Sequence, residues 1–381
     1  MIINNCKLVY LDKVECGSLL IKNNIIEKIN PKMYEDEIII DGGGRFLSPG
    51  FIDIHTHGAA GYDVMEGSYQ SLNSVSLTLA SHGITSFLPT LVPSTIPLIV
   101  KALEGIKKAM GKTLGANILG ANFESPFVNI AMAGALDINY LLPPTIDNIK
   151  NIIDDYASII TSMTIAPELE GAMELIAYLT KIGIKASLGH TNANYNEAIL
   201  GIEKGISHST HLYNAMKGLH HREPGTVGAI FDTHISCELI CDGIHVSYPS
   251  IRIALKQKTT DEIILISDSM MATCMGEGEY SLGGLKVYVK NGSARLENGT
   301  LAGSLLTLDK SISNLLLNTS LKLPELIKMA TYNPAIFCGV ANKKGLIKEG
   351  YDGDLILFDE AINIHKVIIG GNIIENNIET F

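Results

Sequence analysis

Eight short apolar runs, separated by stretches with helical character, recur between residues 51 and 268. The runs read FIDIH, ITSFLPTLV, ANILGANFE, ASIITSMTIAP, KASLGH, ISHSTH, SCELICD and EIILISD. Parallel strands that are buried on both faces have this continuous apolar character, and each parallel neighbour needs a crossover that is usually a helix. The pattern therefore predicts an α/β fold, a (β/α)8 TIM-like barrel, with a doubly wound open sheet as the structural alternative.

The two ends of the chain carry a different pattern, namely short β-type runs broken by Asn, Asp and Gly. Neither end has enough strands to bury a core alone, so we expect both to pair in one small discontinuous β-sandwich domain. The predicted division is 1–47 and 341–381 for this domain and 48–340 for the barrel. The segment 276–300 is predicted to form a β-hairpin excursion before the final helices.

Charge and composition argue against several classes of protein. The 381 residues are 46% hydrophobic, carry a formal net charge of -11 and contain no basic run, which disfavours nucleic-acid and anionic-membrane surfaces. The six cysteines fit no zinc-ribbon spacing and are expected to be reduced thiols. The N-terminus lacks a signal-peptide pattern, and no apolar run approaches the roughly 18 residues of a membrane span. We therefore expect a soluble, cytoplasmic protein.

Most of the predicted strands end in a side chain that can bind a metal ion. In a (β/α)8 barrel the catalytic groups lie at the C-terminal ends of the strands, around one cavity. The first run ends with His55 and His57, which project from the same face because they stand two residues apart. The other candidates are Glu124, His190, His211 and Asp268, and Asp242 and His245 follow the seventh run. Four imidazoles and two carboxylates can hold one or two divalent ions at about 2.0–2.2 Å.

The remaining histidines fit this pattern less well. Three lie outside it and are expected on the surface or in hydrogen-bonded core positions: His82, His234 and His365. His208 stands three residues before His211, so a strand would place the two on opposite faces. His220 and His221 lie in the loop after the sixth run, where a functional and a solvent-exposed role both stay open.

Several motifs resemble the amidohydrolase superfamily and, within it, the N-acetylglucosamine-6-phosphate deacetylase family. They are PGFIDIHTHG, ESPF, GHTNA, THLYNAMKGLHHREPG, CDGIH, ISDSM and TLAGS. The resemblance spans essentially the whole chain. THLYNAM with HHREPG is highly specific, whereas HTH marks only the superfamily. The fold that the resemblance implies is the barrel with a two-part β-domain, and the activity is removal of an acetyl group from a phosphosugar, giving acetate and glucosamine 6-phosphate.

The resemblance also implies roles for individual residues. Glu124, His190 and His211 would be the principal ligands, and His55, His57 and Asp268 would serve a second ion bridged by Glu124. The residues implied at the substrate are Ala135, Leu136, Asn214, Ala215, Arg222, His245, Leu301, Ala302 and Gly303. Of these, Asn214, Ala215 and Arg222 would hold the phosphate, and His245 would contact the sugar. The ions would be zinc, iron, manganese or a similar metal, and the family resemblance suggests a homodimer.

Two departures from the family pattern concern the substrate. Where relatives carry basic residues and then Gly-Ala-His or Gly-Ala-Gln, this chain reads IAMAGALD, so that Leu136 replaces a polar residue. ESPF also stands where EGPF is usual. The galactosamine isomer of the phosphosugar, or an unphosphorylated N-acyl compound, therefore stays open as substrate. A non-catalytic relative is a further alternative, although such a protein would be expected to lose ligands that are all present here.

Asp268 is the predicted general base. Next to an activated water it would accept a proton and then return that proton to the amine as the C–N bond breaks, so that one carboxylate serves both steps. The fourth run ends without a lysine, so no candidate for a carboxylated-lysine bridge occurs there.

Overall fold

The computed structural model describes residues 1–32 and 38–374 and contains the predicted barrel. Its strands are all parallel and follow the order β6-β9-β11-β12-β13-β14-β15-β16, with β10 paired on β9. The bounds are β6 (Phe51–Thr56), β9 (Ile84–Leu91), β10 (Asn117–Ile118), β11 (Ala121–Glu124), β12 (Ile160–Ile165), β13 (Lys185–Leu188), β14 (Ile206–Ser209), β15 (Ser236–Ile240) and β16 (Ile263–Ile266). Each of the eight predicted runs overlaps one of these strands, except that ANILGANFE is split into β10 and β11.

Backbone contacts between β6 and the segment after β16 close the barrel. The Asp268 N–H donates to the His55 carbonyl (2.9 Å), and the His57 N–H donates to the Ser269 carbonyl (2.7 Å). Thr56 and Ser269 also form an isolated parallel bridge. The first and last strand ends of the barrel therefore lie side by side, although they are more than 200 residues apart in sequence.

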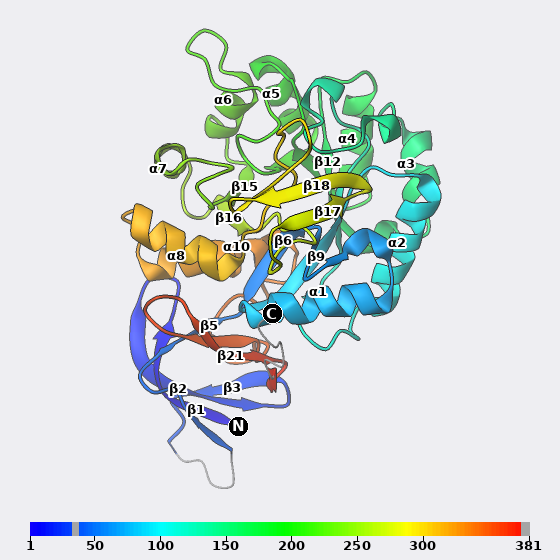
Figure 1. The fold of residues 1–381 in the computed structure, drawn as a ribbon. Coiled ribbons are helices and arrows are strands. Elements are labelled where there is room, and N and C mark those ends of the chain that lie inside the picture. Colours follow the sequence, from blue (N-terminus) through cyan, green and yellow to red (C-terminus); the bar gives the residue numbers. More distant parts are fainter. Residues whose placement is uncertain (33–37, 375–381) are drawn as a thin grey trace.

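Helices surround the barrel on its outside (Figure 1). They are α1 (Tyr69–Ser81), α2 (Ile96–Ala109), α3 (Ile146–Ile153), α4 (Ala172–Lys181), α5 (Tyr195–Lys204), α6 (Gly225–Phe231), α7 (Tyr248–Gln257), α8 (Leu308–Asn318), α9 (Leu323–Ala330) and α10 (Tyr332–Phe337). In α2 the buried positions Ile99, Ala102, Leu103 and Ile106 recur at the helical period and form one apolar face. Within the described residues every helix falls short of the length and apolar character that a membrane span requires.

The strands at the two ends of the chain form one eight-stranded sheet outside the barrel (Figure 1). They are β1 (Ile2–Val9), β2 (Val14–Lys22), β3 (Ile25–Ile29), β4 (Ile39–Asp41), β5 (Phe46–Pro49), β20 (Leu355–Phe358), β21 (Ile364–Ile369) and β22 (Asn372–Ile374). Strand β5 joins the two parts, because it pairs parallel with β1 and antiparallel with β20. This sheet has its own core, which includes Leu8, Leu19, Leu47 and Leu355. The division at residues 47 and 340 stays a prediction.

The excursion before the final helices is a three-stranded antiparallel sheet. Its strands are β17 (Gly278–Leu282), β18 (Leu285–Lys290) and β19 (Ser293–Arg295), so the predicted hairpin gains a third strand. Leu282 lies buried in a small cluster with Met270 and Ala302. The excursion thereby packs onto the loop that follows β16. Parts of two predicted terminal runs, residue 37 and residue 375, lie outside the described residues.

Candidate metal centre

The six predicted ligands all stand at, or just beyond, the C-terminal ends of barrel strands. His55 is in β6 and His57 directly follows it, whereas Glu124 is the last residue of β11. Three further ligands each stand two residues beyond a strand end: His190 after β13, His211 after β14 and Asp268 after β16. These three have positive φ angles of 47°, 22° and 51°. A non-glycine residue in this region costs about 1–3 kcal/mol and persists where the surroundings enforce it, which is common at functional sites.

The imidazole Nε2 atoms converge on the Glu124 carboxylate. Oε1 of Glu124 lies 2.9 Å from Nε2 of His211 and 3.1 Å from Nε2 of His190. The same oxygen lies 3.5 Å from Nε2 of His55, and Oε2 lies 3.5 Å from Nε2 of His57. The carboxylate therefore stands between the two pairs of imidazoles.

Asp268 completes the second group of donors. Its Oδ1 lies 3.2 Å from Nε2 of His57 and 3.5 Å from Nε2 of His55. Two buried triads result, one formed by His55, His57 and Asp268 and the other by Glu124, His190 and His211; within each, the donor atoms lie within 4.8 Å of one another. Glu124 belongs to the second triad, and its Oε2 also lies 3.5 Å from Nε2 of His57 in the first, so its carboxylate stands where a ligand that bridges two ions would stand.

The opposite ring nitrogens explain why the Nε2 atoms face inward. Nδ1 of His55 lies 2.9 Å from Glu238 Oε2, and Nδ1 of His57 lies 3.0 Å from the Thr90 carbonyl. Nδ1 of His190 lies 2.8 Å from the Met132 carbonyl. Since each partner is an acceptor, Nδ1 carries the hydrogen and Nε2 keeps its lone pair for a metal ion. Nδ1 of His211 has no partner among the described residues.

The donor set fits a divalent cation. Nε2 atoms of His190 and His211 stand 3.1 Å apart, and those of His55 and His57 stand 3.3 Å apart. Two deprotonated nitrogens cannot hydrogen-bond to each other, so each close pair needs either a proton or a cation between the rings. Imidazole with carboxylate is a ligand set that zinc, iron and manganese all accept.

The pKa values of the cluster point to the same need for positive charge. Burial alone would lower the pKa of His55, but the carboxylates of Glu238, Asp268 and Glu124 raise it to about 10. Conversely, burial would raise the pKa of Glu124, and the imidazoles of His190 and His55 hold it well below its usual range. In the absence of metal the cluster therefore retains protons, which a bound ion would displace.

A cavity of about 280 Å³ opens directly above these ligands. Of the predicted substrate residues, the cavity lining includes Ala135, Leu136, Asn214, Ala215, His245, Leu301 and Gly303. Ala302 is buried and does not line the cavity. Arg222 lies on an exposed loop outside the lining, where its Nη1 is 2.9 Å from Nε2 of His221.

Two lining residues have distinct surroundings. Leu136 is buried against Val92 and Val128, so its side chain adds apolar surface where a polar group was expected.

His245 is oriented by Asp242, because its Nδ1 lies 2.6 Å from Oδ2 of that carboxylate. Oδ1 of Asp242 accepts the His245 backbone N–H (2.8 Å) and thereby fixes the turn as well. The Nε2 atom of His245 is left for a polar group in the cavity.

The sequence analysis missed Glu238, which is fully enclosed in β15. Besides His55 Nδ1, its Oε2 accepts the His211 backbone N–H (2.9 Å). Its Oε1 lies 3.3 Å from Nε2 of His208, whose Nδ1 lies 2.7 Å from Ser236 Oγ. One carboxylate thus positions a ligand of each triad. One feature of the sequence could have identified Glu238, namely a charged residue inside an apolar strand that is buried on both faces.

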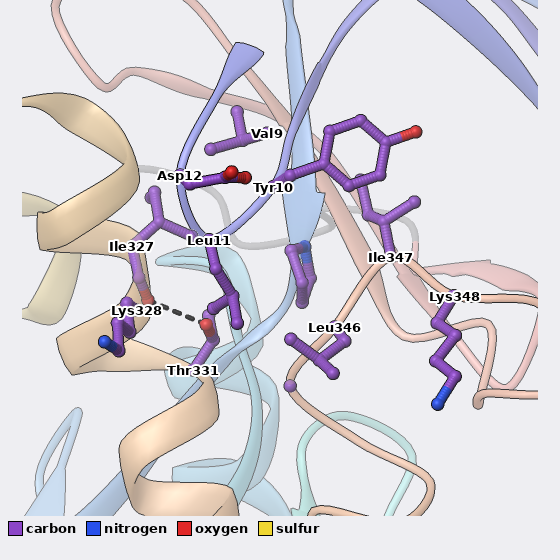
Figure 2. Close-up of a pocket in the computed structure, with 12 residues that line it drawn as sticks. Val9, Tyr10, Leu11, Asp12, Ile327, Lys328, Thr331, Leu346, Ile347 and Lys348 are labelled. Atoms are coloured by element: carbon purple, nitrogen blue, oxygen red, sulfur yellow. Dashed lines mark hydrogen bonds between the residues drawn. The ribbon is translucent and has the colours of Figure 1, made fainter. Parts of the chain in front are cut away.

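A second cavity, of about 250 Å³, lies between the turn after β1, helix α9 and the segment after α10 (Figure 2). Leu11, Ile327 and Leu346 make its walls apolar, and the Thr331 hydroxyl there donates to the Ile327 carbonyl (2.7 Å). It contains no predicted site residue and neither of the metal-binding triads of the described chain. Both triads of the described chain therefore lie at the first cavity.

Changing His190 or His211 to Ala removes a direct ligand and should empty the triad to which both belong. Changing His55 and His57 together should lower the content by about one ion per chain if two ions bind. Elemental analysis of the purified variants measures this. An exposed histidine far from the cluster, His234, provides the control, since His234→Ala should keep the full metal content. An active, metal-free preparation of the unaltered protein would contradict the metal centre.

Changing Glu238 to Gln should lower metal affinity or turnover by about 10-fold to 100-fold, the usual scale for a residue that orients a metal ligand. The amide has one acceptor oxygen in place of the two that serve His55, His208 and the His211 N–H. Glu262→Gln is the matched control, because Glu262 also accepts several hydrogen bonds but lies outside the cluster. Equal metal affinity and turnover in both variants would show that Glu238 does not position the ligands.

Comparisons with known proteins agree with the fold. Residues 46–374 match the sequence profile of the amidohydrolase family. A Lysinibacillus sphaericus protein named N-acetylglucosamine-6-phosphate deacetylase is 38% identical over 336 residues, which are 88% of this chain and 87% of that protein. An Escherichia coli O157:H7 protein named N-acetylgalactosamine-6-phosphate deacetylase is 32% identical over 357 residues, covering 93% and 94% of the two chains.

A solved structure extends the similarity to three dimensions. The crystal structure of N-acetylglucosamine-6-phosphate deacetylase from Pasteurella multocida has a TM-score of 0.93 to this chain at 30% identity, and 98% of each chain is covered. The family profile covers the strands that carry the six candidate ligands, and the sequence relatives and the solved structure each span most of the chain. The chain belongs to the amidohydrolase family.

Proposed function

We propose that this protein is a metal-dependent hydrolase that removes the acetyl group of N-acetylglucosamine 6-phosphate, giving glucosamine 6-phosphate and acetate. The observation that carries the proposal is the pair of buried triads meeting at Glu124 on the floor of the cavity, in a chain 38% identical to a deacetylase of that name. The complete ligand set disfavours a non-catalytic relative.

The residues of the cavity have different roles in the proposed reaction. A divalent cation held by the triads would lower the pKa of a water molecule toward 7 and polarise the acetyl carbonyl. Asp268, which lines the cavity beside His57, accepts the proton of the attacking water and returns it to the departing amine. His245, oriented by Asp242, donates or accepts a hydrogen bond at a sugar hydroxyl through Nε2.

Phosphate recognition is assigned to the loop after β14. Asn214 and Ala215 line the cavity, and Arg222 follows them on the same loop with an exposed guanidinium that pairs with no carboxylate among the described residues. An acidic protein repels a dianion at long range, so binding depends on such local donors. A guanidinium is suited to this task because it contacts a phosphate with two parallel N–H groups.

The galactosamine isomer is the second candidate substrate. Leu136 presents an apolar side chain in the cavity where the family pattern has a polar one, and the E. coli relative carries the name of that activity. Acetate release from the two 6-phosphates and from free N-acetylglucosamine compares the candidates directly. The larger kcat/KM identifies the substrate, and equal rates on free sugar would contradict the phosphosugar assignment.

Three further parts of the proposal concern the metal, the oligomeric state and the compartment. The metal is zinc, iron or manganese, since imidazole and carboxylate ligands accept each of them and availability decides. The protein is a homodimer, and it works in the cytoplasm. Its partner is the small phosphosugar substrate. We expect it to bind neither nucleic acid nor a membrane, because the protein is acidic.

Changing Asp268 to Asn should lower kcat by about 10²-fold to 10⁴-fold, the scale expected when a general acid–base is lost. The amide keeps the shape of the side chain but cannot accept and return the proton. The measurement is acetate release at saturating substrate, with metal content determined on the same preparation. Turnover within a few-fold of the unaltered enzyme across the pH range would remove Asp268 from this role.

Changing Arg222 to Met should lower kcat/KM for the 6-phosphate by at least about 10²-fold, because the charge contact with phosphate is lost. Slow turnover of the unphosphorylated sugar should barely change, since that substrate makes no such contact. Arg252→Met is the control, because Arg252 is also exposed but lies on α7 and donates to the Asn318 carbonyl. An equal loss of kcat/KM on both substrates would show that Arg222 does not bind the phosphate.

A further inference from the structure

A second group of reactive side chains lies outside the metal centre. It consists of Cys274 on the loop after β16, His82 at the end of α1, and Asp309 in the first turn of α8. Sγ of Cys274 lies 3.2 Å from Nε2 of His82, and Nδ1 of His82 lies 3.0 Å from Oδ2 of Asp309. Three segments far apart in sequence thus place a thiol, an imidazole and a carboxylate in a row.

The order of these groups indicates activation of the thiol. The thiol and the carboxylate contact opposite nitrogens of the His82 ring, so they cannot ligate one ion together with it, and the group is not among the metal-binding triads of the described residues. A nucleophile next to an imidazole whose other nitrogen is held by a carboxylate is the arrangement that activates Cys and Ser in enzymes.

The electrostatics of His82 favour its protonated form. Burial alone would lower the pKa of His82, but the hydrogen bonds to Asp309 and Cys274 and their negative charges raise it to about 10. The imidazole is therefore protonated at neutral pH and places a positive charge 3.2 Å from Sγ of Cys274.

The backbone holds Cys274 in an uncommon conformation. Its φ angle is +66°, a region that L-residues other than Asn and Asp seldom adopt. Neighbouring contacts enforce it, since the Thr273 carbonyl accepts the Ala60 N–H (2.8 Å) and the Met275 N–H donates to the Ala272 carbonyl (2.9 Å). Local strain of this kind clusters at functional positions.

The other cysteines lack this environment. Cys6 and Cys237 are buried, and burial raises the pKa of their thiols to about 11 and about 12. Cys338 behaves in the same way, with its pKa raised to about 12. Cys16 is exposed like Cys274, but no imidazole contacts it among the described residues. Cys16 therefore serves as an internal reference for an exposed, unactivated thiol.

We propose that Cys274 is a redox-modification site, at which a hydroperoxide oxidises the thiolate to a sulfenic acid. The thiolate sulfur attacks the terminal oxygen of the hydroperoxide, the S–O bond forms and the O–O bond breaks. The sulfur loses two electrons to the peroxide, and the departing alkoxide or hydroxide takes the proton from Nε2 of His82. The products are Cys274 sulfenic acid and an alcohol or water. His82 thus acts twice, as the positive partner of the thiolate and as the proton donor to the leaving oxygen.

The test compares two thiols in the same intact protein. The protein is treated with hydrogen peroxide at pH 6 in the presence of a 1,3-dione reagent that captures sulfenic acids, and labelling of each cysteine is followed by peptide mass spectrometry. At this pH an ordinary thiol is only about 0.3% thiolate. Because the His82 ring stands 3.2 Å from its Sγ, Cys274 should label at least about tenfold faster than Cys16.

Variants locate the cause of the difference. His82→Gln should reduce labelling of Cys274 to about the rate of Cys16, and Asp309→Asn should reduce it to a smaller degree. Cys274→Ser should abolish the fast label while keeping acetate release within about twofold, since Cys274 touches no metal ligand. Equal labelling of Cys274 and Cys16 in the unaltered protein, or fast labelling that survives in His82→Gln, would overturn the proposal.

Discussion

The close approach of four imidazole Nε2 atoms around the Glu124 carboxylate is the constraint on which the rest of the site depends. Nitrogen pairs at 3.1 Å and 3.3 Å are tolerable only with positive charge between them, either protons or metal ions. The barrel causes this close approach, because it brings six candidate ligands from five strand ends to one point. The raised pKa of His55 and the lowered pKa of Glu124 both follow from this crowding.

Elements behind the ligands maintain this arrangement. Glu238, in the wall of the barrel, holds the outer nitrogen of His55 and the backbone of His211, and so ties one triad to the other. The positive φ angles at His190 and Asp268 turn the chain just beyond the strands, which sends these side chains across the barrel mouth. Such outer contacts would hold the ring nitrogens in place for a metal ion.

The sequence predicted the barrel and the six side chains that meet at its mouth because both obey general rules. Buried parallel strands read as apolar runs, and catalytic groups stand at their C-terminal ends. Contacts between distant segments obey no such rule: Glu238 gave no local signal of its partners, and Cys274 and His82 are 192 residues apart. Likewise the sequence pattern could not show that Arg222 stands outside the cavity lining or that Leu136 packs on Val92.

The crystal structure of the metal-loaded protein, with anomalous diffraction at the absorption edge of the bound element, tests the central claim most directly. The account predicts divalent ions about 2.0–2.2 Å from the Nε2 atoms of the four histidines, with the Glu124 carboxylate between the two triads. Ions ligated through Nδ1, or bound elsewhere while these four rings keep protons between them, would contradict it.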